Sequence, residues 1–414
     1  MRVCVVGSGG REHALAHVLA RSADVVVTPG NPGIPGSVPT PPEGLTADLY
    51  VIGPEAPLVD GLADRLRASG RLVFGPGADG ARLEGSKAWM KDLLDAAGVP
   101  TARYGSFADE DRALDFLRRL PGPWVVKTDG LAAGKGVLVT ASLDEAVDDV
   151  RAKLRGDAFG DAGRTVVVEE AMSGPELSLL AVCDGTRAVA LAPAQDFKRV
   201  GDGDAGPNTG GMGAYSPVPA AGDDVVATVM DRFVAPTLAE LRRRGIYYRG
   251  VLYAGLMLTP DCPKLLEYNV RFGDPEAQVV LPRLTTDLAE LLAAAADGDL
   301  GAAAAPAFDD DACVTVVLAA EGYPSSPRTG DVITGIAAAE SAGATVFCAG
   351  VGQDERGRLV TAGGRVLDVT ARGSTVSEAR TRAYAAAGHL SWDGMFHRSD
   401  IAQQASRQSE APSR

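Results

Sequence analysis

The sequence is poor in lysine, histidine and aromatic residues, and these shortages narrow what the protein can do. Seven of its 40 basic residues are lysines, aromatic residues make up 5% of the 414 positions, and the four histidines show no triad-like setting. The net charge of −14 disfavours general binding to nucleic acid, because an acidic surface repels the phosphodiester backbone. We therefore expect no nucleic-acid partner. Any site for a phosphate group must be a small cluster of basic residues within the otherwise acidic surface.

Cysteines and long apolar runs are also scarce. The five cysteines are scattered and form no CxxC pair, which indicates free thiols in a reducing compartment. No apolar run approaches the roughly 18 residues that a membrane helix needs, and no signal-peptide pattern follows Met1. These features predict a cytoplasmic protein with no membrane partner.

Glycine, by contrast, is abundant, and it first appears behind a valine-rich segment. Arg2–Val6 is typical of a buried strand, Gly7–Gly10 of a tight turn and Arg11–Arg21 of a helix. Further strands are expected at Asp24–Thr28 and Ala47–Ile52. This order predicts an N-terminal α/β domain with a parallel sheet.

Six prolines lie between residues 29 and 42 and exclude a helix there. The connection between the second and third strands would then lack its usual helix. Apolar side chains such as Val25, Val27 and Val51 would need another cover, either the proline-rich segment itself or a second subunit.

A new α/β unit is expected from about residue 100 to residue 170, and a β-rich segment is expected to begin at Cys313, after a boundary near residue 304. Residues 400–414 are expected to be a disordered tail or a loose helix. The helices expected after the first are Leu58–Ser69, Ala88–Ala97, Glu110–Arg119, Leu143–Leu154, Asp287–Ala304 and Ser377–Ala387.

The glycine turn resembles the start of a dinucleotide fingerprint, but the sixth position is Glu12 instead of glycine or alanine. The second strand also lacks the terminal acid that would hold an adenosine ribose. A nicotinamide dehydrogenase is therefore disfavoured. A small phosphate at the helix N-terminus and a simple packing turn both remain open.

The segment Lys127–Val137 is rich in glycine and carries two of the rare lysines. Small residues let backbone N–H groups close over phosphates, while lysine supplies charge; a surface hairpin is the alternative. The segment Val166–Ala171 covers the end of the strand expected at Thr165–Glu170, which finishes in two acids, and Glu176 follows it. The backbone at this strand end would suit an adenine edge and Glu176 would suit ribose hydroxyls, although acids at a strand end are common.

On the strand around residue 267, Glu267, Asn269 and Arg271 alternate onto one face. Hard oxygens suit Mg²⁺, and a guanidinium suits a phosphate beside it; a solvated strand face is the alternative. The segments Gln195–Arg199 and Gly203–Gly213 offer free N–H groups and two basic residues, or else form a flexible connector.

Taken together, these segments resemble the phosphoribosylamine–glycine ligase family of the ATP-grasp superfamily over nearly the whole chain. The segments that carry the resemblance are GGREHA (9–14), GPEAPLVDG (53–61), LEGSK (83–87), KTDGLAAGKGV (127–137), GPNTGGMGAYSP (206–217), EYNVRFGDPE (267–276), TGDVITG (329–335) and GGRVLDVTA (363–371).

The resemblance implies an N-terminal α/β substrate domain at 1–82, an ATP-grasp unit of two α+β lobes at 83–300 with its small lobe at about 100–170, and a C-terminal β-rich domain at 308–395. It implies ligation of glycine to 5-phosphoribosylamine through glycyl phosphate, with ATP as co-substrate and Mg²⁺ or Mn²⁺ as metal, in purine synthesis. The implied partners are these small molecules. The chain would act as a monomer or self-associate through its shortened N-terminal domain.

The resemblance also implies roles for individual residues. Those for the metal are Glu267 and Asn269, and those for catalysis are Arg271, Lys135 and Asp274. Those for ATP are Lys87, Lys127, Gly130, Gly134, Lys135, Glu169, Glu170, Ala171 and Glu176. Those for the other two substrates are Gly10, Arg11, Glu12, Asn31, Glu55, Asp196, Lys198, Asn208, Thr209, Gly210, Gly211 and Met212.

This chain departs from the family pattern in three ways. It is shorter between Asn31 and Gly53, it has Phe197 where members usually have histidine, and Val251–Leu258 holds no second metal carboxylate. Two rival functions are weighed against the expected one: an ATP-grasp ligase that uses another carboxylate, and a nucleotide-binding regulator without activity. Turnover with individual amino acids distinguishes them.

Overall fold

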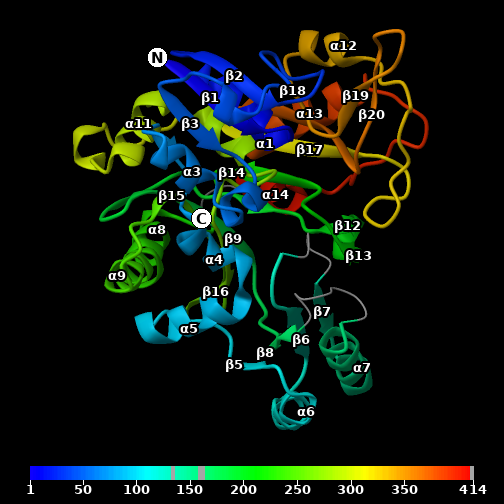
Figure 1. Ribbon diagram of the computed structural model, residues 1–414. Helices are drawn as coiled ribbons and strands as arrows, with labels where there is room; N and C mark the ends of the chain where they lie inside the picture. Colours follow the sequence, from blue (N-terminus) through cyan, green and yellow to red (C-terminus); the bar gives the residue numbers. More distant parts are fainter. Residues whose placement is uncertain (132–135, 157–163, 411–414) are drawn as a thin grey trace.

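The N-terminal part is a four-stranded parallel sheet. The computed structural model describes residues 1–131, 136–156 and 164–410 (Figure 1). The sheet order is β2-β1-β3-β4, and helix α1 packs on β1 and β2. Its elements are β1 (Arg2–Gly7), α1 (Gly10–Leu19), β2 (Asp24–Pro29), β3 (Leu49–Ile52), α2 (Glu55–Val59), α3 (Leu62–Ala68) and β4 (Val73–Phe74). The parallel α/β arrangement predicted for this part is confirmed.

The proline-rich segment forms no α-helix and contains only a 3-10 turn, η1 (Pro42–Gly44). It runs along the sheet edge instead: Val38 N–H donates to Val27 O, and Val27 N–H donates to Gly36 O. Val27 and Val51, expected to need a cover, are fully buried within this single chain, and Val25 is half-buried.

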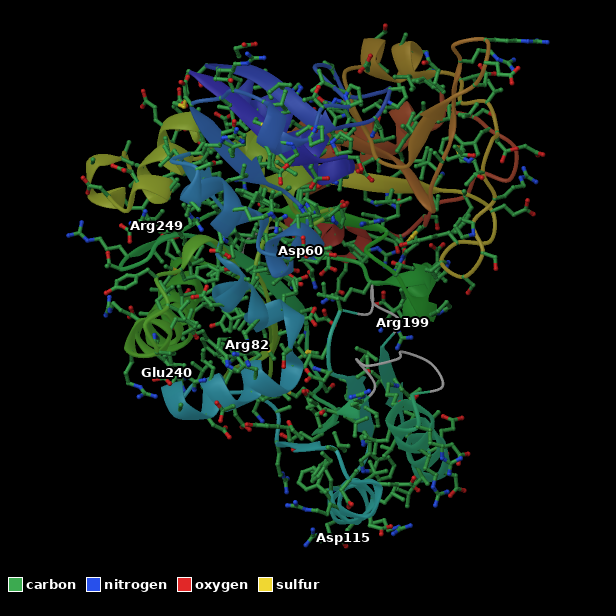
Figure 2. All side chains as sticks on the ribbon, viewed as in Figure 1. Asp60, Arg82, Asp115, Arg199, Glu240 and Arg249 are labelled. Carbon is green, nitrogen blue, oxygen red and sulfur yellow. The ribbon has the colours of Figure 1, made fainter. Side chains whose placement is uncertain are left out.

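A small antiparallel lobe, β5-β8-β6-β7, projects from the rest of the molecule (Figure 1). Its side chains form a hydrophobic core separate from the main one, built on α6, α7 and the sheet. Figure 2 labels Asp115 on α6, at the far end of this lobe. The elements are β5 (Tyr104–Phe107), α6 (Glu110–Arg119), β6 (Trp124–Thr128), β7 (Val137–Thr140), α7 (Leu143–Leu154) and β8 (Val166–Glu170).

The large lobe is a second antiparallel sheet, β10-β9-β15-β16. Its central strands, β9 and β15, are almost wholly buried, and helix α11 packs against both of them. The elements are α4 (Ala78–Gly85), α5 (Lys87–Ala97), β9 (Glu176–Asp184), β10 (Ala188–Ala190), α8 (Asp223–Val229), η4 (Met230–Val234), α9 (Ala235–Arg243), β15 (Arg249–Leu258), β16 (Pro263–Asn269) and α11 (Leu288–Asp297).

A third antiparallel sheet, β11-β14-β17-β21-β18, is called the third sheet below. It joins strands on both sides of the boundary expected near residues 300–308. Its elements are β11 (Gln195–Asp196), β14 (Gly213–Ser216), β17 (Ala312–Ala319), β18 (Thr345–Cys348), β21 (Arg365–Gly373) and the helices α10 (Ala277–Val280), α12 (Ile336–Ser341) and α13 (Val376–Ala387). Two hairpins flank it, β12 (Arg199–Gly201) with β13 (Ala205–Asn208), and β19 (Val351–Gln353) with β20 (Leu359–Thr361).

Two of the expected helices are shorter than predicted, each for a local backbone reason. Gly61 has φ +76° and separates α2 from α3, where one helix was expected. Gly298 has φ +94° and ends α11, after which only the 3-10 turn η6 (Leu300–Ala302) follows.

Within the described residues, the C-terminal segment forms helix α14 (Gln403–Glu410), which packs on α13 and buries Ala405. The helical stretch from α8 to α9 was not predicted. Within the described ranges, no helix is long and apolar enough to cross a membrane.

Candidate active site

One cavity of about 720 Å³ opens between the two lobes, the N-terminal sheet and the third sheet. Its walls come from the glycine turn before α1, from α4 and α5, from β16 and the turn after it, and from loops of the C-terminal part. A smaller adjoining hollow lies between β7 and the hairpin β12–β13, where Figure 2 labels Arg199. Segments far apart in the sequence therefore meet at one place.

The end of β16 presents the expected metal face. Asn269 Oδ1 accepts a hydrogen bond from Arg271 Nη2 at 3.2 Å, and both side chains line the cavity with Glu267. Burial alone would raise the pKa of Glu267, but the charges of Lys198, Lys127 and two further cations outweigh it and hold that pKa low. A carboxylate that stays ionised beside several cations suits a site for phosphates and a divalent metal.

Arg271 is held by acids of two other segments. Its Nη2 donates to Glu84 Oε1 at 3.1 Å and its Nε to Glu55 Oε2 at 3.4 Å. Desolvation raises the pKa of Glu84, against the opposing charge of Arg271. The guanidinium is thus fixed at the cavity wall by α4 and the start of α2.

Two lysines and a glutamate form a buried cluster where α5 meets the small lobe. Glu169 lies between Lys91 and Lys127, at 3.1 and 3.0 Å, and all three side chains are buried. Burial lowers the pKa of Lys91 to about 8, despite the opposing charge of Glu169. Only Lys127 of these three lines the cavity, so Glu169 and Lys91 support it from behind.

Lys87 lines the cavity from the first turn of α5. Its Nζ donates to Gly130 O at 2.9 Å, and Ala88 N–H donates to Asp129 Oδ1 at 3.1 Å. These bonds join α5 to the glycine-rich segment of the small lobe. Lys87 and Lys127 therefore face the same space from two sides.

The expected ribose and glycine residues meet in one ionic network. Lys198 Nζ contacts Glu176 closely, and Asp196 Oδ1 lies 3.9 Å from the same nitrogen. Burial raises the pKa of Asp196 to about 7. Glu276 lines the cavity nearby, where its Oε1 accepts from Tyr253 Oη at 2.5 Å.

In the glycine turn before α1, the carboxylate of Glu12 accepts hydrogen bonds from the turn itself and from Arg11. Glu12 Oε2 accepts from Gly9 N–H at 2.6 Å, and Glu12 Oε1 accepts from Arg11 Nε at 2.6 Å. A Cβ on Gly7 or Gly53 would collide with this carboxylate at 2.5 and 2.1 Å. Glu12 therefore occupies the helix N-terminus, while Arg11 turns toward the cavity.

Asn31 and Gly10 lie at the junction with the third sheet and are not among the described residues that line the cavity. Asn31 Nδ2 donates to Ser8 O, Cys348 O and Ala349 O at 2.8, 3.2 and 3.0 Å. Both were expected to contact substrate; the structure gives them contacts within the protein.

The loop 208–212 closes one side of the cavity. Thr209 N–H donates to Lys198 O at 2.7 Å, and Gly211 N–H donates to Thr209 Oγ1 at 3.0 Å. Met212, the last residue of the loop, is fully buried and does not face the cavity. The backbone N–H groups of Glu170 and Ala171, expected near adenine, donate to Arg103 O and Pro123 O.

The structure thus brings a large part of the expected set to the cavity wall, and leaves the rest behind it or at domain junctions. Residues at the wall are Arg11, Glu55, Lys87, Lys127, Asp196, Lys198, Asn208, Thr209, Gly210, Glu267, Asn269, Arg271 and Asp274. Those not at the wall are Gly10, Glu12, Asn31, Gly130, Glu169, Glu170, Ala171, Glu176, Gly211 and Met212. Gly134 and Lys135 lie outside the described residues.

Sequence reasoning missed several polar residues at the wall. Glu84 and Glu276 both lie inside segments that carried the family resemblance, so their acidic side chains were a usable signal. Arg365, from the C-terminal part, also lies inside such a segment, GGRVLDVTA (363–371). Tyr323 lies in none of them.

Two antiparallel lobes that enclose a cavity lined by lysines, a carboxylate–amide pair and an arginine define the class: an ATP-grasp ligase. Models of phosphoribosylglycinamide synthetase match the chain in its N domain (1–84), its ATP-grasp domain (85–277) and its C domain (313–404).

Individual proteins agree with this result. A phosphoribosylamine–glycine ligase of Xanthomonas campestris is 48% identical over 420 residues, covering 97% of each chain. The crystal structure of a phosphoribosylamine–glycine ligase from Thermotoga maritima has a TM-score of 0.88 at 35% identity, covering 97% of this chain and 100% of that one. The chain therefore belongs to the phosphoribosylamine–glycine ligase family.

A more distant structure shares the fold alone. The biotin carboxylase domain of Hydrogenobacter thermophilus 2-oxoglutarate carboxylase, in complex with MgADP and bicarbonate, has a TM-score of 0.70 at 15% identity. The match covers 95% of this chain and 91% of that one.

Proposed function

We propose that this chain joins glycine to 5-phosphoribosylamine at the expense of ATP, forming glycinamide ribonucleotide, ADP and phosphate in purine synthesis. The supporting observation is that one cavity is lined by the cations Lys87, Lys127 and Arg271, by the hard oxygens of Glu267 and Asn269, and by the loop residues 208–210. Family membership supports the same reaction.

In the first half, a glycine carboxylate oxygen attacks the γ-phosphorus of ATP, and ADP leaves. Lys87 and Lys127 neutralise phosphate oxygens, and Arg271 faces the phosphoryl group in transfer. Lys135 is proposed to act with them. The product, glycyl phosphate, has a good leaving group where glycine itself had none.

In the second half, the amine of phosphoribosylamine attacks the acyl carbon, phosphate leaves and the amine loses a proton. Asp274 lines the cavity in which this step is proposed to take place. Burial would raise the pKa of its carboxyl group, but the charges of Arg365 and Arg11 outweigh that effect and keep the pKa low. An ionised Asp274 suits the positively charged nitrogen that forms during attack. Arg11 and Glu55 face the cavity from the N-terminal part and are proposed for the phosphoribosylamine side.

Glu267 and Asn269 fit Mg²⁺ or Mn²⁺, because both offer hard oxygens at one end of β16. Among the described residues, no three His, Cys, Asp or Glu side chains form a metal cluster. Phosphate oxygens would therefore complete the coordination, and the bound ion would neutralise their charge.

The decisive experiment supplies ATP, phosphoribosylamine formed in situ and one amino acid at a time, and follows ADP release and the product mass. Glycine should be the productive acid. Glycine labelled with ¹⁸O in its carboxylate should pass one label to phosphate. Turnover with a different acid would favour another ATP-grasp ligase, and ATP binding without turnover would favour a regulator.

We also propose the division into parts at 1–82, 83–300 and 308–395, with the chain acting as a cytoplasmic monomer. The separate core of the small lobe supports the division within the ATP-grasp unit. Burial of Val27 and Val51 without a second subunit supports the monomer, which light scattering can test.

A further inference from the structure

The C-terminal strand β21 begins with an arginine that reaches across to the substrate side of the cavity. Arg365 Nη1 donates to Gly210 O and to Asp274 O, each at 2.8 Å. Its Nη2 donates to Asp274 Oδ2 at 3.0 Å. One guanidinium therefore ties the loop 208–212 to the turn that carries Asp274.

A second C-terminal residue holds the same peptide from its other end. Tyr323 Oη accepts from Gly210 N–H at 2.9 Å. A Cβ at Gly210 would lie 2.8 Å from Arg365 Cζ, so only glycine allows the guanidinium to lie this close. The N–H and the C=O of Gly210 are thus both bound by the C-terminal part.

The arrangement of these hydrogen bonds fits arginine and not lysine. Two nitrogens of the planar guanidinium donate three hydrogen bonds to acceptors on two segments, and the single ammonium nitrogen of lysine does not reproduce this geometry. The side chain of Arg365 is only 20% exposed, so solvent competes weakly for these bonds.

We propose that Arg365, assisted by Tyr323, is a positioning residue that sets the distance between Asp274 and the loop 208–212. The inference rests on the proposed function, in which those two segments receive glycine and the amine. Because Arg365 contacts neither lysine of the ATP side, its removal should affect the acyl-acceptor half of the site and leave ATP binding alone.

The test compares Arg365→Met with Arg372→Met. Arg372 lies on the same strand, where it pairs with Asp309 and Asp311 and does not line the described cavity. Arg365→Met should lower kcat/KM for glycine about 100-fold, the loss typical of a small misplacement of reacting groups. Its KM for ATP and its thermal midpoint should match those of Arg372→Met, and Arg365→Lys should recover only part of the activity.

Hydrogen exchange supplies a readout that does not depend on turnover. Peptides covering 208–212 should exchange faster in Arg365→Met than in Arg372→Met. If wild-type protein fails to use glycine, the proposed function falls, and the exchange comparison still decides the positioning role.

A third variant covers a failure to fold. If Arg365→Met does not fold, Tyr323→Phe removes one hydrogen bond and should lower kcat/KM for glycine up to about tenfold with unchanged KM for ATP. Equal kcat/KM in the two methionine variants, equal exchange, or a parallel rise in the KM for ATP would overturn the proposal.

Discussion

The substitution Gly10→Ala tests how tightly the N-terminal helix is seated on the C-terminal sheet. A Cβ at Gly10 would lie 1.9 Å from Asp368 Oδ2 and 2.9 Å from Gln278 Nε2, where ordinary contacts are 3.4–4 Å. Asp368 cannot easily yield, because it is buried and accepts from Gln278 Nε2 at 2.9 Å. The added methyl group must therefore separate α1 from β21 or break that hydrogen bond.

The expected loss of stability follows from these two options. Overpacking a dense interior costs about 1–3 kcal/mol, and orphaning a buried hydrogen-bonding group costs about 1–3 kcal/mol. The better helix propensity of alanine returns at most about 1 kcal/mol. Because one of these two costs applies, a net loss of about 1–3 kcal/mol is expected, visible as a fall of a few degrees in the thermal midpoint.

The matched control is Gly388→Ala, at the end of α13. Gly388 has φ −64°, and its Cβ would meet nothing closer than Ala385 O at 3.4 Å, so this change should leave the midpoint almost unmoved. A Gly10→Ala protein as stable as the control would refute the packing argument. If it were stable but had a raised KM for phosphoribosylamine, Gly10 would contact substrate, as the sequence alone suggested.

Three further predictions follow from the site and its supports. Glu267→Gln should fold normally but lose turnover on the order of a thousandfold at saturating Mg²⁺, because several kcal/mol of charge stabilisation disappear; near-normal turnover would reject the metal role. Glu169→Gln should lower the free energy of unfolding by about 3–5 kcal/mol in urea titrations, since two buried lysines lose their carboxylate; an unchanged midpoint would contradict this. Burial lowers the pKa of His13 from 6.5 to about 4, so the unfolded chain binds more protons between these values and stability should fall by about 3 kcal/mol on acidification from pH 6.5 to 4. The variant His13→Gln should show less of that dependence in unfolding measured at several pH values, and an identical pH profile would count against the assignment.

The part of the site that the sequence predicts best lies on single continuous segments. Glu267 and Asn269 follow the two-residue period of β16, and that period places them together. Arg271 was expected on the same strand but lies beyond its end, and its Nη2 donates to Asn269 Oδ1 at 3.2 Å. Lys127 was selected because lysine is scarce in this chain. Such local patterns can be recognised in the sequence because they do not depend on which distant segments become neighbours in the fold.

The residues that sequence analysis missed depend on long-range contacts. Arg365 reaches Asp274 across 91 positions, and Glu84 reaches Arg271 across 187. No local pattern in the sequence encodes such a pairing. The split at Gly61 was missed for a different reason: the apolar pattern continues through it, and only the positive φ of the glycine interrupts the helix.

Asn31 shows how the proline-rich connection between β2 and β3 supports the site beside it. Its side-chain amide binds carbonyls of Ser8 on one side and of Cys348 and Ala349 on the other, which joins the N-terminal turn to the C-terminal part. Its Oδ1 also accepts from Gly33 N–H at 2.8 Å, so the amide is engaged at both ends. Ser8 and Ala349 line the cavity, whereas Asn31 is not among its lining residues. A helix between β2 and β3 is therefore not needed to place these walls, because a side chain at the start of the proline-rich segment does so directly.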